Sequence, residues 1–189
     1  MMRMRGAGSL PLALLVVAGC GGEAEGGSEA EAPAAAEAPE LALPDTTAEA
    51  VWAHLTASDY QSWELWPGTD ALYAGTEPHG MLLTTYVNSV MAEALAEGRT
   101  TELADGAIVV KDNYMPDSTF AASTVMYQAP GDYNAEGNGW WYLKRNADES
   151  VDAAGGAGTG CHGCHVAAEG EDYLFTSLPE SVDMAGDGP

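Results

Sequence analysis

Residues 107–113 read Ala-Ile-Val-Val-Lys-Asp-Asn and follow the turn pair Asp105-Gly106. β-branched side chains fit the pleated surface of a strand, so this stretch predicts a β-strand. Side chains alternate between the two faces of a strand, which puts Lys111 on the same face as Ala107 and Val109. A lysine on an apolar strand face is unusual in a chain with only six cationic residues, and it is the first candidate for a functional side chain.

The segments on either side of this strand predict further strands and a few short helices. Three stretches are rich in β-branched or aromatic residues and predict strands: residues 81–87, 120–128 and 140–145. Two stretches predict short amphipathic helices: residues 47–57, and residues 89–97 closed by Gly98. Residues 146–160 are rich in Gly, Ala and Asp and predict a loop. These patterns favour one β-rich domain.

Residues 161–165, Cys-His-Gly-Cys-His, form the C-x-x-C-H pattern by which c-type haem is attached. On one helical turn, positions 161, 164 and 165 lie at i, i+3 and i+4 and face the same way. Cys161 and Cys164 can then bond the porphyrin while His165 binds the iron. Zinc would need a fourth ligand, and a dithiol redox pair would leave His165 unexplained. The motif therefore predicts one covalent haem c.

The motif lies near the end of the chain, with 24 residues after His165. The one methionine among them, Met184, lies in the string Asp-Met-Ala-Gly-Asp-Gly-Pro. A second axial ligand would therefore have to come from the preceding domain, which favours a five-coordinate iron open to a small molecule. His79 is interpreted as a turn residue or one with a satisfied hydrogen bond rather than as an iron ligand, and His162 as a variable position of the motif.

The N-terminal residues predict export and a lipid anchor. Residues 1–19 combine Arg3 and Arg5 with a short apolar core and resemble a lipoprotein signal peptide. Cys20 then becomes the lipid-bearing residue, although an ordinary cleaved signal peptide with an incidental cysteine is the alternative. Gly21 rather than Asp favours a periplasm-facing lipoprotein of the bacterial outer membrane. Two acidic flexible segments complete the expected organisation: a tether over residues 20–43 and a disordered tail over residues 179–189.

The charge balance excludes some partners. Six Lys and Arg residues stand against 29 Asp and Glu, for a net charge of −23. Nucleic acid and anionic lipid surfaces are therefore poor partners. A basic redox partner protein and a small neutral or cationic substrate are compatible with this charge, and so is a role in solubility alone.

Five segments together resemble the cytochrome P-460 family over residues 47–176: HGMLLTTYVN, DGAIVVKDNYMPD, GWWYLKR, CHGCH and DYLF. The resemblance implies an antiparallel sheet, commonly in a homodimer, with an open distal haem face. The expected fold is thus α+β, a predominantly antiparallel β-sheet with a few short helices, in a single haem-binding domain over residues 44–178.

The resemblance also implies site residues beyond the motif. Founding members of the family bond a lysine to the porphyrin edge, and Lys111 is the match by strand position. The alternatives for Lys111 are a strand-end lysine that reaches solvent and one that pairs with a carboxylate. Lys144 is the poorer candidate. A distal carboxylate or phenylalanine is expected in the two branches of the family, and five residues are candidates: Asp112, Asp117, Glu136, Phe120 and Phe175.

Three functions are compatible with a c-type haem, and the first two of them follow from the resemblance. The first is an oxidoreductase that oxidises a small nitrogen compound, such as hydroxylamine or nitric oxide, and passes electrons to a redox partner. The second is a non-enzymatic gas-binding protein like the β-type cytochromes c′. The third is an electron-transfer cytochrome with a six-coordinate iron.

Overall fold

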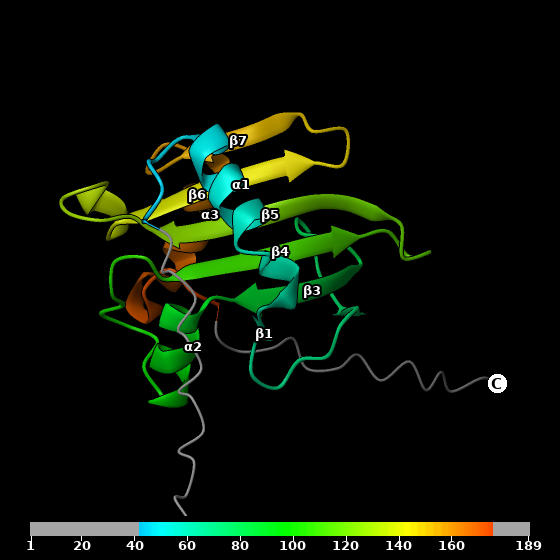
Figure 1. Ribbon diagram of the computed structural model, residues 1–189, viewed down its shortest axis with the longest axis horizontal. Coiled ribbons are helices and arrows are strands. Elements are labelled where there is room, and N and C mark those ends of the chain that lie inside the picture. The colour runs from blue at the N-terminus through cyan, green and yellow to red at the C-terminus, as the bar shows by residue number, and fades with distance from the viewer. Residues whose placement is uncertain (1–41, 176–189) are drawn as a thin grey trace, which may run out of the picture. The chain divides into compact units, whose positions relative to one another are not determined.

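One antiparallel sheet organises the computed structural model, which describes residues 42–175 (Figure 1). Within these residues the sheet has seven strands: β1 Glu64–Leu65, β2 Tyr73–Ala74, β3 Leu82–Val87, β4 Ile108–Tyr114, β5 Phe120–Gln128, β6 Trp140–Asn146 and β7 Val151–Gly155. Their order is β1-β3-β4-β5-β6-β7, and β2 also pairs with β3. The expected α+β fold with a predominantly antiparallel sheet is confirmed.

Three short α-helices accompany the sheet in the described residues: α1 Ala48–Ala57, α2 Ser89–Ala96 and α3 Gly160–His165. Short 3-10 segments lie at η1 Tyr60–Ser62, η2 Ala135–Gly137 and η3 Val166–Glu171, the last with a kink at Ala168. The expected helices over residues 47–57 and 89–97 are confirmed to within a residue at each end. So is the short helix at the cysteine motif.

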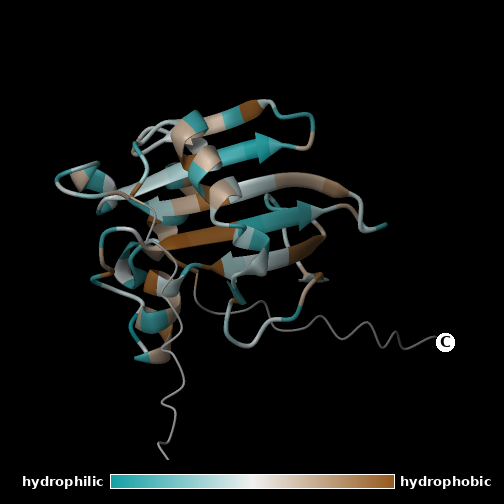
Figure 2. Ribbon diagram, in the orientation of Figure 1, coloured by the Kyte–Doolittle hydropathy of each residue, from teal (hydrophilic) through white to brown (hydrophobic). Residues whose placement is uncertain are grey.

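The two faces of the sheet carry separate cores because neighbouring residues of a strand point to opposite sides. On one face, Val51 and Leu55 of α1 pack in a buried cluster with Ile108 and Val110 of β4. On the other face, α2 and the C-terminal residues pack with Val109 and other residues of β4, β5 and β6. Figure 2 shows β4 passing from hydrophobic to hydrophilic along its length. The site described below is on the second face.

The strand register sets a polar row across that second face. Lys111 of β4 lies opposite Thr85 of β3 and Thr124 of β5. Thr124 in turn lies opposite Lys144 of β6, and Lys144 lies opposite Ala153 of β7. Lys111 shares this face with Ala107 and Val109, as its alternation along the strand predicts.

The loop expected over residues 146–160 is wrong in part, because β7 lies within it. Residues 151–155 are Val-Asp-Ala-Ala-Gly, a sequence with little strand preference. The segment forms a strand because it pairs with residues 142–145 of β6, whose edge would otherwise be unpaired. The pairing partner, rather than local propensity, decides this element.

Several predicted segments lie outside the described residues: the signal peptide 1–19 with Cys20, most of the tether 20–43, and the tail 179–189. Over residues 42–175, no helix is both long enough and apolar enough to cross a bilayer.

Candidate functional site

Helix α3 presents the cysteine–histidine motif. Its N-cap is Thr159, whose Oγ1 accepts a hydrogen bond from the His162 backbone N–H at 3.2 Å. Cys161 is half-buried against the core of the second face, whereas Cys164 is exposed, and both thiols are free. Burial raises the pKa of the Cys161 thiol. The short helix therefore carries both thiols and the His165 imidazole at positions i, i+3 and i+4.

His165 is held in a single orientation by a backbone carbonyl. The side chain is buried, and its Nδ1 lies 2.6 Å from the carbonyl oxygen of Tyr173. A carbonyl only accepts hydrogen bonds, so Nδ1 is the donor. Burial lowers the pKa of His165, which favours the neutral ring. The lone pair is then on Nε2, the arrangement in which histidine binds metals while its other nitrogen is anchored.

Aromatic side chains surround the His165 ring. Its centre lies 5.5 Å from that of Tyr142, 5.3 Å from that of Phe175 and 6.2 Å from that of His79. The Tyr142 hydroxyl is buried without a hydrogen-bond partner among the described residues. A buried hydroxyl ordinarily has a hydrogen-bond partner, so the Tyr142 hydroxyl is available to a group other than the described protein side chains.

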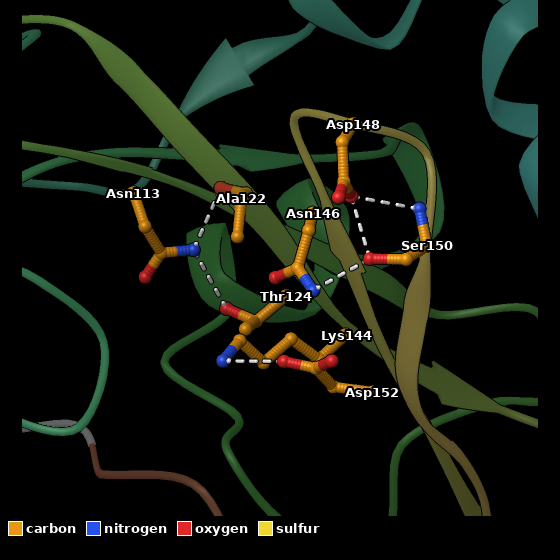
Figure 3. Close-up of polar contacts among 8 residues, drawn as sticks. All are labelled: Asn113, Ala122, Thr124, Lys144, Asn146, Asp148, Ser150 and Asp152. Carbon is orange, nitrogen blue, oxygen red and sulfur yellow. Dashed lines mark hydrogen bonds and ion pairs between the residues drawn. The ribbon is translucent and has the colours of Figure 1, made fainter.

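Lys111 and Lys144 lie in the same row of the sheet, but only one of these two lysines has an ion-pair partner. The Lys144 ammonium pairs with Asp152 at 3.0 Å, and both side chains are substantially exposed (Figure 3). The Lys111 Nζ pairs with no described residue, and burial lowers its pKa. The positive charge of Lys111 also lowers the pKa values of His79 and His165. Of the two lysines, Lys111 is therefore the unpaired amine near both rings.

His79 comes from the loop before β3 and faces the same region. Its Nδ1 lies 3.2 Å from Thr124 Oγ1 on β5. Burial, followed by the charges of Lys111, His165 and Lys144, lowers the pKa of His79 to about 3. The interpretation of His79 as a residue with a satisfied hydrogen bond is supported, but its place beside His165 is new. The two histidines are 86 positions apart, and the sequence holds no signal that joins them.

A second polar cluster supports Thr124 from the neighbouring strand. Asn113 Nδ2 donates to the Ala122 carbonyl at 3.0 Å and lies 3.3 Å from Thr124 Oγ1 (Figure 3). The other amide atom, Asn113 Oδ1, is buried without a partner among the described residues. The Thr124 hydroxyl that contacts His79 is thus fixed by the sheet.

The candidate carboxylates lie in three different places. Asp112 is fully buried on the α1 face, where it accepts hydrogen bonds from Tyr60 and Ser123. Asp117 is in the β4–β5 turn, where it accepts from the Thr119 backbone N–H. Glu136 lines an open cavity of about 480 Å³ that Tyr173 also lines. Asp112 is therefore separated from Lys111 by the sheet.

The two candidate phenylalanines lie in different parts of the structure. Phe175 contacts the His165 ring and is 55% exposed. Phe120 packs against Tyr114 at the far end of β4, with ring centres 5.8 Å apart. Only Phe175 is part of the site around His165.

The residues present fit a haem better than a protein-built metal centre. No group of three or more His, Cys, Asp or Glu side chains in residues 42–175 is arranged to hold a metal ion. A porphyrin brings four nitrogens of its own, so it needs from the chain only an oriented imidazole and, in the c-type, two free thiols. His165, Cys161 and Cys164 supply these groups.

Comparison with known proteins gives one family match. The family model described as cytochrome P-460 matches residues 57–176, more than half of the chain and nearly all of its described part. A search of curated proteins found no match.

Proposed function

Because the chain belongs to the cytochrome P-460 family of haem proteins, we propose that Cys161, Cys164 and His165 hold one covalently attached haem c. The observation that carries this proposal is the geometry of α3. Both thiols and the imidazole are on one short helix, and the Tyr173 carbonyl fixes the His165 ring with Nε2 free.

Covalent attachment needs only the thiols of this chain and the vinyl groups of the porphyrin. Each thiol adds across one vinyl double bond, so that a sulfur–carbon bond forms and the thiol hydrogen moves to the neighbouring carbon. The addition is redox-neutral once both thiols are reduced, and Cys161 and Cys164 are free thiols here. Export by residues 1–19 and lipidation at Cys20 belong to the same proposal, since c-type haem in bacteria is attached outside the cytoplasm.

The reaction we propose is the oxidation of a small nitrogen compound, hydroxylamine or nitric oxide. Haem, when bound, would supply the iron that takes electrons from the substrate. A redox partner protein would then accept these electrons one at a time. Lys111 is the residue we expect to form the lysine bond of the founding family members. To form that bond, the amine loses one hydrogen and a porphyrin carbon loses another. An oxidant such as peroxide takes up the two protons and two electrons and is reduced to water.

The setting of Lys111 supports this role. Its amine has no ion-pair partner in residues 42–175, and burial lowers its pKa, which increases the fraction of neutral, nucleophilic amine. Lys144 lacks these properties because Asp152 pairs with it.

The optical spectrum of the reduced holoprotein tests the proposal, with Lys111→Ala and Lys144→Ala side by side. We expect a strongly red-shifted Soret band in the wild type and in Lys144→Ala, and an ordinary c-type band in Lys111→Ala. We also expect the wild type to reduce a one-electron acceptor when hydroxylamine is added.

Two results would count against this function. An ordinary c-type spectrum in all three proteins would make Lys111 a structural residue. Reversible nitric oxide binding without any hydroxylamine-dependent turnover would favour the gas-binding function of the β-type cytochromes c′ instead.

A further inference from the structure

Two consecutive residues directly after η3 have left-handed backbone angles. The φ angle is 56° at Asp172 and 62° at Tyr173. In this region the Cβ atom of any residue other than glycine crowds the backbone, so the conformation persists only where surrounding contacts hold it. Such residues cluster at functional sites. Here the Tyr173 carbonyl that the conformation presents is the group bonded to His165 Nδ1.

Asp172 is held by two hydrogen bonds from distant parts of the sequence. The indole Nε1–H of Trp140, a fully buried residue at the start of β6, donates to the Asp172 carbonyl at 2.9 Å. Asn138 Nδ2 donates to Asp172 Oδ1. Asp172 itself is only 4% exposed. Because their donors lie 32 and 34 positions earlier in the chain, these bonds fasten the segment after η3 to the β5–β6 connection.

The neighbours of Asp172 are fixed in turn. The Asn138 carbonyl accepts a hydrogen bond from Gln128 Nε2, on the last residue of β5, at 2.7 Å. The Tyr173 backbone N–H donates to the Ala168 carbonyl at 2.8 Å, and the Tyr173 hydroxyl donates to the Glu136 carbonyl at 2.9 Å. The Tyr173 carbonyl is therefore positioned by contacts at Asp172 and at Tyr173 itself.

The position of the Tyr173 carbonyl affects the electron density of the His165 ring as well as its orientation. His165 Nδ1–H donates to this carbonyl at 2.6 Å. A strong hydrogen bond at one ring nitrogen raises the basicity of the other, here Nε2. A more basic axial imidazole stabilises ferric over ferrous iron, so it lowers the reduction potential.

We propose that Asp172, held by Trp140 and Asn138, is a positioning residue for His165. It acts through the backbone of Tyr173, whose carbonyl it places against the imidazole, and so keeps the reduction potential of the bound haem low. The proposal rests on the haem site proposed above and adds to it residues outside the cysteine–histidine motif.

The midpoint potential of the covalent haem, compared between the wild type and Trp140→Phe, tests this assignment. The substitution keeps an aromatic ring but removes the N–H that donates to the Asp172 carbonyl. We expect the potential to rise, because a displaced carbonyl leaves the imidazole less basic. The ferric-to-ferrous ratio at a fixed potential should change by roughly tenfold, which is about 59 mV for a one-electron couple.

Trp141→Phe is the matched control. Trp141 is the next residue of β6 and is also buried, but it packs in the cluster on the α1 face of the sheet. The same chemical change there should lower the unfolding free energy to a comparable extent. The midpoint potential should stay at the wild-type value, which separates positioning of the imidazole from general stability.

Asn138→Gly is the second variant, and it also serves if Trp140→Phe takes up no haem. Asn138 has a φ angle of 49°, which glycine adopts without strain. The change therefore removes the donor to Asp172 Oδ1 without a backbone penalty, and it alters no formal charge. We expect its midpoint potential to rise, as in Trp140→Phe.

The outcomes separate this proposal from the one on which it rests. Absence of covalently bound haem in the wild type would overturn both. Covalent haem with the same midpoint potential in the wild type, Trp140→Phe and Asn138→Gly would overturn only the Asp172 assignment. An equal rise in Trp141→Phe would also overturn it, since loss of packing alone would then explain the shift.

Discussion

Lys111 and Asp112 are neighbours in the sequence but belong to opposite sides of the sheet. Lys111 points to the face of α3, whereas the Asp112 carboxylate is buried beneath α1. Gln61 Nε2 donates to Asp112 at 3.0 Å, in addition to the bonds from Tyr60 and Ser123. A buried carboxylate with three donors is a satisfied structural group. Because neighbouring side chains of β4 point to opposite faces, Asp112 follows Lys111 in the sequence but does not pair with it.

We predict that Tyr60→Phe weakens the fold without changing the haem site. The change removes a hydroxyl that donates to Asp112 at 3.1 Å and leaves a buried carboxylate with one donor fewer. The expected cost is about 1–3 kcal/mol of unfolding free energy, measured by urea denaturation at pH 7. The optical spectrum of the holoprotein should remain that of the wild type.

Tyr86→Phe is the matched control, since the Tyr86 ring packs against Tyr60 at 5.7 Å while its hydroxyl is bonded to no described residue. It should change the unfolding free energy little. Burial, with a further contribution from Asp112, raises the pKa of Tyr60. The folded chain then keeps the phenol protonated above about pH 10, where the unfolded chain loses it, so wild-type stability falls there and the gap to Tyr60→Phe narrows. Equal losses in both variants would contradict this assignment.

Among the elements, those with a clear local pattern were predictable and those that depend on a partner were not. The β-branched residues 108–110 and the aromatic residues 140–142 predict β4 and β6 directly. β7 is Gly- and Ala-rich and forms only because β6 offers an edge. β1 and β2 are two residues each, too short for any periodicity.

The candidate site divides in the same way. Positions 161, 164 and 165 lie within one motif, so their common helical turn could be predicted from spacing. The approach of His79 to His165 could not, because it depends on the β3–β4–β5 register and on the return of the chain after β7. The carbonyl of Tyr173 that anchors His165 carries no side-chain signal at all.

Helix α3 has only six residues, so its N-cap matters for the site. We predict that Thr159→Ala lowers the unfolding free energy by about 1 kcal/mol, since replacing an N-cap threonine by alanine typically costs about that much stability. The variant should also load haem less completely, because the backbone N–H of His162 inside the motif loses its acceptor. Haem content per polypeptide, measured after identical expression, is the readout.

Thr47→Ala provides the same chemical change at the N-cap of α1, where Thr47 Oγ1 accepts from the Ala50 backbone N–H at 3.1 Å. It should cost a similar free energy but leave the haem content at the wild-type level. A matching loss of haem in both variants would show that global stability, rather than the cap of α3, controls loading.

In the molecule as a whole, one face of the sheet is covered by packed structural residues and the other carries the candidate site residues. The α1 face is closed by apolar packing and by the Asp112 hydrogen bonds. The opposite face carries the free thiols, the two histidines and the unpaired Lys111. The net charge of −23 is compatible with a basic redox partner protein, as the sequence predicts. The homodimer stays a prediction of the family resemblance.

Covalent haem attachment is tested most directly by the intact mass of the protein after co-expression with a c-type haem maturation system. Wild-type chain and the Cys161→Ala/Cys164→Ala double variant are compared under denaturing conditions. We expect one haem to be retained on the wild-type polypeptide and none on the double variant. A wild-type mass equal to the bare polypeptide, with haem lost on acid extraction, would contradict it.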